Sequence, residues 1–136
     1  MIGIIIVTHA AIGDAYRHLA QHFFPHLPNH IRLIGVLNHE DHCSVIANVH
    51  TEIADLGTPH GVLVLTDIFG ATPCNAVRKL LVPNQVAILT GLNAPMMLKA
   101  IQYSTQATDL NTFIEQVKQA AIDGIFALTT PPESEN

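Results

Sequence analysis

Three short segments of the chain contain side chains that could carry out chemistry together. They are residues 8–11, 66–73 and 90–95, which offer an imidazole at His9, a carboxylate at Asp67 and several hydroxyl groups. A neutral imidazole nitrogen can act as a nucleophile, and a carboxylate can accept a hydrogen bond from the other ring nitrogen. Residue type and position alone also allow His9 to be a loop residue without chemistry and Asp67 to be a helix cap.

Each of these segments follows a run of apolar residues that predicts a buried strand. Such runs lie at 2–7, 61–65 and 86–89, and a further one lies at 31–37. Continuous apolar, β-branched runs are typical of parallel strands that are covered on both faces. In an open parallel sheet, ligands bind beyond the carboxyl ends of the strands. The three segments are therefore expected to meet at one edge of a sheet.

Helical patterns separate these runs and complete the predicted fold. The alternation predicts an α/β fold with an open, mostly parallel, doubly wound sheet of four strands and with helices on both faces. The expected helices are one over 15–23 that Pro25 ends, one over 41–56 that stops at Gly57, one that Thr72 caps with Pro73 in its first position, one over 95–103 and one over 110–122.

The end of the chain carries two further predictions. Residues 125–128 form a short apolar run that predicts a last strand, and a terminal strand can be exchanged between two copies of a chain at low cost. Residues 130–136 are polar, contain proline and are expected to form a disordered tail. The expected organisation is one domain, 1–129, followed by that tail.

The segments that follow the strands also favour an anionic ligand. The first N–H groups of a helix have no intrahelical partner, and such groups bind phosphate. Gly70 and Gly91 allow the backbone to approach a ligand closely. A dinucleotide-binding fingerprint is missing, because the turn after the first strand has Gly13 as its single glycine. An ATP-binding P-loop and the acidic cluster of a response-regulator receiver are missing as well.

The composition narrows the classes of partner and the compartment. The 136 residues include six Lys and Arg against eleven Asp and Glu, for a net charge of −5, and no basic run occurs. Nucleic acid and anionic membrane surfaces are therefore not expected as partners. The amino terminus lacks the basic start of a signal peptide, and no apolar run reaches the roughly 18 residues of a membrane span. The expected location is the cytoplasm.

Several of the nine histidines are spaced as metal ligands can be. His18, His22 and His26 follow one another at intervals of four, and His39 and His42 are three apart. A pair of this kind on one helical face can bind zinc. Because a proline is expected to end the helix before the third of these residues, and no cysteine lies within the run, we expect solvent-exposed side chains rather than a metal site.

Three longer stretches, 4–9, 61–76 and 91–96, carry a more specific pattern. The middle stretch contains, in order, Asp67, Ile68, Phe69, Gly70, Ala71, Thr72, Pro73, Cys74 and Asn75. In these stretches the sequence resembles the IIA component of the mannose family of the bacterial phosphoenolpyruvate-dependent sugar phosphotransferase system. The order and spacing of the motifs agree up to about Leu128. The differences are Ala10 and Ala71, where the family often has glycine, and Thr72, where it often has serine.

The resemblance implies that the chain is a phosphocarrier, which acts as a protein-histidine phosphotransferase. His9 would accept a phosphoryl group from the carrier protein HPr and pass it to a histidine of a IIB component, and Asp67 would orient the His9 ring. Membrane IIC and IID components would be reached through IIB, and no metal or cofactor is expected. The residues expected to bind the phosphoryl group are Thr8, Gly70, Ala71 and Thr72.

Two alternatives remain on the same fold. Dihydroxyacetone kinase systems use a phosphocarrier subunit with the same active histidine, but its second loop typically runs Asp-Met-Gly-Ser-Ala, unlike the residues after Asp67. A regulatory module that binds a partner without carrying phosphate would not need both His9 and Asp67. The favoured function is therefore that of a mannose-type carrier in sugar uptake or its regulation. The family resemblance also implies a homodimer.

Overall fold

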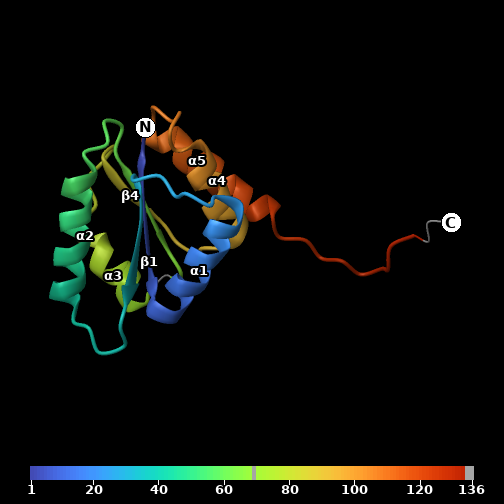
Figure 1. The fold of residues 1–136 in the computed structure, drawn as a ribbon, viewed down its shortest axis with the longest axis horizontal. Helices are drawn as coiled ribbons and strands as arrows, with labels where there is room; N and C mark the ends of the chain where they lie inside the picture. The colour runs from blue at the N-terminus through green and yellow to red at the C-terminus, as the bar shows by residue number, and fades with distance from the viewer. Residues whose placement is uncertain (69, 134–136) are drawn as a thin grey trace.

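The computed structural model describes residues 1–68 and 70–133, and Figure 1 shows their arrangement. The predicted alternation of strands and helices is confirmed, and α2 stops at Gly57, in the left-handed region with φ 54°, as predicted. The elements follow one another as β1 (Gly3–His9), α1 (Ala10–Phe23), β2 (Ile31–Val36), α2 (His42–Leu56), β3 (Val62–Thr66), α3 (Thr72–Arg78), β4 (Val86–Leu89), α4 (Ala94–Tyr103) and α5 (Leu110–Asp123).

The four strands form one parallel sheet in the order β2-β1-β3-β4. In its register, His9 of β1 is opposite Val36 of β2, and Val7 of β1 is opposite Thr66 of β3. The chain goes from β1 to β2 on one side and then returns to β3 on the other side of β1. The strand order therefore reverses between β1 and β3, which is the place where open parallel sheets bind ligands.

Helices cover both faces of the sheet, as predicted, and Figure 1 shows the two layers. On one face α1, α4 and α5 enclose a core that includes Ile4 and Phe113. On the other face α2 and α3 enclose a second core that includes Ile5 and Val49. Because successive residues of a strand point to opposite faces, the continuous apolar run of β1 fills both cores.

α2 and α4 begin one residue from the predicted start, at His42 and Ala94, and α1 and α3 also begin elsewhere than predicted. α1 starts at Ala10, directly after His9, although the apolar spacing indicates a helix only from residue 15. α3 starts at Thr72 with Ala71 as its N-cap, so the predicted cap at Thr72 is wrong by one residue. Pro73 is then the second residue of α3. Proline is tolerated there because the second N–H of a helix has no intrahelical partner either.

The predicted last strand is absent from the described chain. Residues 125–128 follow α5 without helix or strand, and Ile125, Phe126 and Leu128 are 73%, 77% and 89% exposed. Figure 1 shows this segment running away from the body of the molecule. A strand needs a neighbouring strand for its backbone hydrogen bonds, and residues 125–128 pair with no strand of the described chain. Exchange in a dimer stays a prediction, as does the tail 130–136, of which residues 134–136 lie outside the described part.

Candidate active site

His9 and Asp67 lie on either side of the point where the strand order reverses. His9 is the last residue of β1, and Asp67 directly follows β3. β1 and β3 are hydrogen-bonded neighbours, so the two residues end adjacent strands at the same edge of the sheet. The structure thus brings together the two predicted catalytic residues, which are 58 positions apart in the sequence.

The imidazole of His9 and the carboxylate of Asp67 are in direct contact. The distance between Nδ1 of His9 and Oδ2 of Asp67 is 2.6 Å, and the backbone N–H of His9 donates to the same oxygen at 3.0 Å. The backbone N–H of Ile68 donates to Oδ1 at 3.0 Å. The side chain of Asp67 is 6% exposed and that of His9 is 39% exposed. A buried carboxylate that is hydrogen-bonded through both oxygens therefore holds a ring that solvent can reach.

The electrostatics of the pair determine which ring nitrogen is free. Burial by itself raises the pKa of Asp67, but the hydrogen bonds from His9 and Ile68 outweigh it, so the pKa lies below its ordinary value. Asp67 is therefore ionised at neutral pH and can only accept hydrogen bonds. Nδ1 of His9 must carry the proton of this hydrogen bond. In the neutral ring, the lone pair is then on Nε2, which can act as a nucleophile.

Three of the predicted phosphoryl-binding residues form the turn that leads from Asp67 into α3. Gly70 has φ 86°, in the left-handed region that favours glycine, and Ala71 has the extended backbone of an N-cap. Asn75 stabilises this turn, because its side-chain amide donates a hydrogen bond to the carbonyl of Gly70 at 3.0 Å. Since Ala71 is the N-cap, the hydroxyl of Thr72 is not used to cap the helix.

Thr8 differs from these three residues because its side chain lies inside the protein. The residue is fully buried, and its hydroxyl donates to the carbonyl of His9 at 3.0 Å. A Cβ atom on Gly13 of α1 would lie 2.8 Å from Oγ1 of Thr8, so the hydroxyl faces α1. The structure does not bring this hydroxyl to the exposed side of the His9 ring. Thr8 instead supports the backbone of His9.

Tyr16 is a residue beside the site that the sequence analysis missed. It lies two turns after His9 on the same side of α1, is half-buried, and donates from its hydroxyl to the carbonyl of Leu92 at 3.3 Å. Burial and the negative charge of Asp67 raise the pKa of Tyr16, so its phenol stays protonated. The signal that could have found it is the spacing of seven residues from His9, which repeats a helical face.

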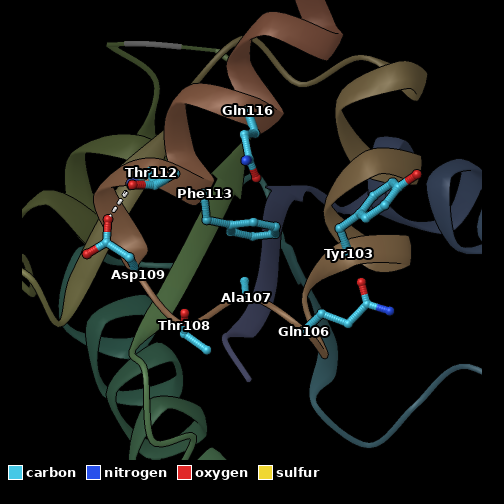
Figure 2. A pocket seen from close by; sticks show the side chains of 8 residues that line it. All are labelled: Tyr103, Gln106, Ala107, Thr108, Asp109, Thr112, Phe113 and Gln116. Carbon is cyan, nitrogen blue, oxygen red and sulfur yellow. Dashed lines mark hydrogen bonds between the residues drawn. The ribbon is translucent and has the colours of Figure 1, made fainter.

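A hollow lies at the opposite edge of the sheet from His9, between the end of α4 and the start of α5 (Figure 2). Its volume is about 330 Å³, and its wall includes Tyr103, Phe113 and Asp109. The carboxylate of Asp109 accepts hydrogen bonds from the backbone and the hydroxyl of Thr112 at the start of α5. The carboxylate of Asp109 thus serves as a helix cap, and none of the predicted site residues lines the hollow.

The histidines that are spaced as metal ligands can be lie mostly at the surface. His18, His22, His26 and His39 are exposed, as predicted, and His42 is half-buried. Within residues 1–68 and 70–133, no group of three or more His, Cys, Asp or Glu side chains could hold a metal ion. In the same residues, no helix has both the length and the apolar character to cross a membrane.

The chain is similar in sequence and fold to several known proteins. The curated mannose-specific EIIAB component of the PTS system from Escherichia coli (strain K12) is 24% identical over 132 residues, which are 96% of this chain and 41% of that protein. The chain thus spans less than half the length of this relative. The structure of phosphotransferase system component EIIA from Streptococcus agalactiae has 25% identity and a TM-score of 0.83, with 93% of this chain and 97% of that chain covered.

A further structure, the mannose/sorbose specific IIA subunit from Enterococcus faecalis, shares the fold, with 18% identity, a TM-score of 0.83 and 98% coverage of both chains. The family described as “PTS system fructose IIA component” matches residues 3–118. This match covers most of the chain, and it confirms the resemblance found in the sequence. The chain therefore belongs to the mannose and fructose family of IIA components of the phosphotransferase system.

Proposed function

We propose that this chain is a phosphocarrier that accepts a phosphoryl group on His9 from phosphorylated HPr and passes it to a IIB component, in sugar uptake or its regulation. The observation that carries the proposal is the 2.6 Å contact between Nδ1 of His9 and Asp67, which leaves Nε2 as the nucleophilic atom of an exposed ring. Family membership supports the class of reaction.

The transfer is a displacement between two histidines. Nε2 of His9 attacks the phosphorus of the donor phosphohistidine, the N–P bond of the donor breaks, and an N–P bond forms on His9. The proton on Nδ1 stays in place, and the ring becomes positively charged. The carboxylate of Asp67 stabilises that charge and keeps the ring in position. The same steps in reverse, with a histidine of IIB as the acceptor, release the group.

The turn after Asp67 is the proposed site for the phosphoryl oxygens. The backbone N–H of Ala71 makes only a long hydrogen bond, of 3.4 Å, to the carbonyl of Ile68, so a phosphoryl oxygen could replace it. The hydroxyl of Thr72 and the backbone at Gly70 follow Asp67 along the same turn. The start of α1 at Ala10 adds the positive end of a helix dipole next to His9.

The surroundings of His9 suit a protein partner better than a small molecule. Ile12 in the first turn of α1, Leu37 directly after β2 and Ile68 next to Asp67 are all exposed apolar side chains. Because Val36 is opposite His9 in the sheet, Leu37 lies at the same edge as the site. Apolar side chains gathered around a reactive residue are typical of protein–protein contacts. This supports transfer between proteins.

Incubation of the chain with phosphorylated HPr, followed by intact-mass measurement, tests the proposal. We expect the gain of one phosphoryl group, and no gain with unphosphorylated HPr. Peptide mapping under alkaline conditions, which preserve phosphohistidine, should place the group on the peptide that contains His9. A chain that binds HPr and gains no mass would instead be a regulatory module without phosphate transfer.

We also propose that the chain forms a homodimer by pairing of residues 125–128 with a partner chain. These residues are exposed and apolar, and β4 is an edge strand. Its outer backbone groups after Val86, which is bonded to Val82, could pair with them. Light scattering at micromolar concentration should give the mass of two chains, and truncation after Gly124 should give one. A monomeric full-length chain would rule the dimer out.

The remaining parts of the proposal concern organisation and location. We expect residues 1–129 to act as the phosphocarrier domain and residues 130–136 to be a tail that transfer does not need. A cytoplasmic location belongs to the same proposal, because the HPr and IIB partners are expected there. Transfer at an unchanged rate after removal of 130–136 would support this division.

A further inference from the structure

Tyr16 connects two of the segments that meet at the active site. Its hydroxyl donates to the carbonyl of Leu92, in the loop between β4 and α4, at 3.3 Å. The backbone N–H of the same residue, Leu92, donates to the carbonyl of Thr66 at 3.0 Å. Thr66 immediately precedes Asp67. A continuous path of two hydrogen bonds thus leads from α1 to the residue before the catalytic carboxylate.

These two hydrogen bonds complete a closed set of links between the three segments at the site. α1 begins directly after His9, and His9 is bonded to Asp67 through its side chain and its backbone. The segments after β1, β3 and β4 are therefore each linked to the next, and Tyr16 supplies the link between the first and the last. Among the described residues, no other hydrogen bond joins α1 to the loop at Leu92.

The aromatic ring of Tyr16 packs against the apolar core, whereas its hydroxyl takes no part in that packing. The side chain is half-buried and packs against the core that α1, α4 and α5 enclose. Replacement by phenylalanine keeps this packing and removes one hydroxyl. The substitution can therefore separate the hydrogen bond from the fold.

We propose that Tyr16 is a positioning residue for phosphoryl transfer, which holds the loop at Leu92 and thereby keeps Asp67 in place against His9. The inference rests on the proposed phosphocarrier function. It adds a residue that contacts neither the phosphoryl group nor the partner protein, and that acts through the backbone beside Asp67. Its loss should lower the rate of the chemical step and leave the binding of the donor unchanged.

The test compares Tyr16→Phe with Tyr103→Phe, the same change at the other of the two tyrosines. Tyr103 ends α4 at the opposite edge of the sheet and is 39% exposed. For transfer from phosphorylated HPr, Tyr16→Phe should lower kcat about two- to ten-fold, as expected for one lost hydrogen bond, with KM unchanged. Tyr103→Phe should match the unsubstituted chain in both constants.

A second measurement does not depend on transfer. In the unphosphorylated protein, the proton on Nδ1 of His9 should give a downfield NMR signal that exchanges slowly, because Asp67 holds it. Tyr16→Phe should shift or broaden this signal, and Tyr103→Phe should not. Tyr16→Leu, which fills the apolar site without a hydroxyl, should repeat the result if the phenylalanine variant does not fold.

The outcomes separate the two proposals. If the unsubstituted chain accepts no phosphoryl group, the proposed function fails, and the proton signal alone decides whether Tyr16 positions the pair. If transfer occurs, an unchanged kcat in Tyr16→Phe overturns the inference. A raised KM with an unchanged kcat also overturns it, because that result would mean that Tyr16 contacts the partner.

Discussion

Two histidines, His9 and His30, lie at opposite edges of the sheet, and the protein holds them in opposite ways. His9 ends β1 at the carboxyl edge, with a ring that is 39% exposed and bonded to the carboxylate of Asp67. His30 precedes β2 at the amino edge, is 8% exposed, and has its Nε2 at 2.8 Å from the hydroxyl of Ser104, which is fully buried. The ring of His9 contacts a charged group and solvent, whereas the ring of His30 contacts a neutral hydroxyl in the interior.

The difference between the partners decides what each ring can do. The hydroxyl of Ser104 donates to the carbonyl of Ile101 at 3.2 Å, so its oxygen accepts the N–H of His30. Burial and the positive charge of the amino terminus lower the pKa of His30, so the ring stays neutral. A hydroxyl cannot stabilise a positive ring as a carboxylate does. His30 is thus suited to link elements, whereas His9 is suited to gain and lose a phosphoryl group.

The largest expected effect on phosphorylation is the difference between substituting His9 and substituting His30. His9→Ala should abolish phosphorylation by HPr, because it removes the nucleophile. His30→Gln should leave phosphorylation intact, because it replaces a ring at the other edge of the sheet. Intact mass after incubation with phosphorylated HPr measures both. Full transfer by His9→Ala, or phosphate on His39, His42 or His60, would contradict the assignment.

The second-largest expected effect is on the rate of transfer, when the carboxylate of Asp67 is removed and His9 is kept. Asp67→Ala should slow transfer about a hundred- to a thousand-fold, as is typical when one electrostatic partner of a reacting group is lost. The reaction should not stop, because Nε2 of His9 is still present. Single-turnover transfer rates measure the effect, and an unchanged circular dichroism spectrum controls for the fold. A rate equal to that of the unsubstituted chain would show that Asp67 is not needed.

The buried histidine should instead affect stability, in a pH-dependent way. A histidine in the unfolded chain titrates near pH 6.5, and the pKa of His30 in the folded protein is lower. Between these two values the unfolded state binds more protons, so the free energy of unfolding should fall as the pH is lowered through 6.5. One such group contributes at most about 1.4 kcal/mol per pH unit.

Urea unfolding between pH 5 and pH 8 measures this slope. His30→Gln keeps an N–H donor for Ser104 but does not titrate, so its slope should be shallower than that of the unsubstituted chain. The matched control is His18→Gln, since His18 is exposed on α1. Equal slopes in the unsubstituted chain and in His30→Gln would show that His30 is not the group responsible.

The smallest effect concerns Thr8 and Thr66, the two threonines that precede the proposed catalytic residues. The hydroxyl of Thr8 donates to the carbonyl of His9, whereas the hydroxyl of Thr66 is buried without a hydrogen-bond partner among the described residues. Thr8→Val should therefore cost about 1 kcal/mol of stability, and Thr66→Val should be neutral or slightly stabilising. Urea unfolding at pH 7 measures both. Equal losses in the two variants would reveal a bond of Thr66 that the described residues do not contain.

The sequence by itself predicted the four strands of the sheet, the five helices and the two candidate catalytic residues. It missed where α1 and α3 begin, and the last strand that it predicted at 125–128 is absent from the described chain. Apolar runs and helical spacing are local properties of the chain, and they predict local structure because burial requires the same periodicity in any fold. Rules for parallel sheets then indicated that His9 and Asp67 lie at the carboxyl edge. The family motifs added their roles as expectations.

Only the tertiary structure decided which strands are neighbours, and with that which side chains meet. The order β2-β1-β3-β4 puts β1 beside β3, and hence His9 beside Asp67. It also turns the hydroxyl of Thr8 toward α1 and brings Tyr16 to the loop at Leu92. The partners of Thr8 and Tyr16 depend on packing between distant segments, whereas residue spacing reports only which residues share a face of one element.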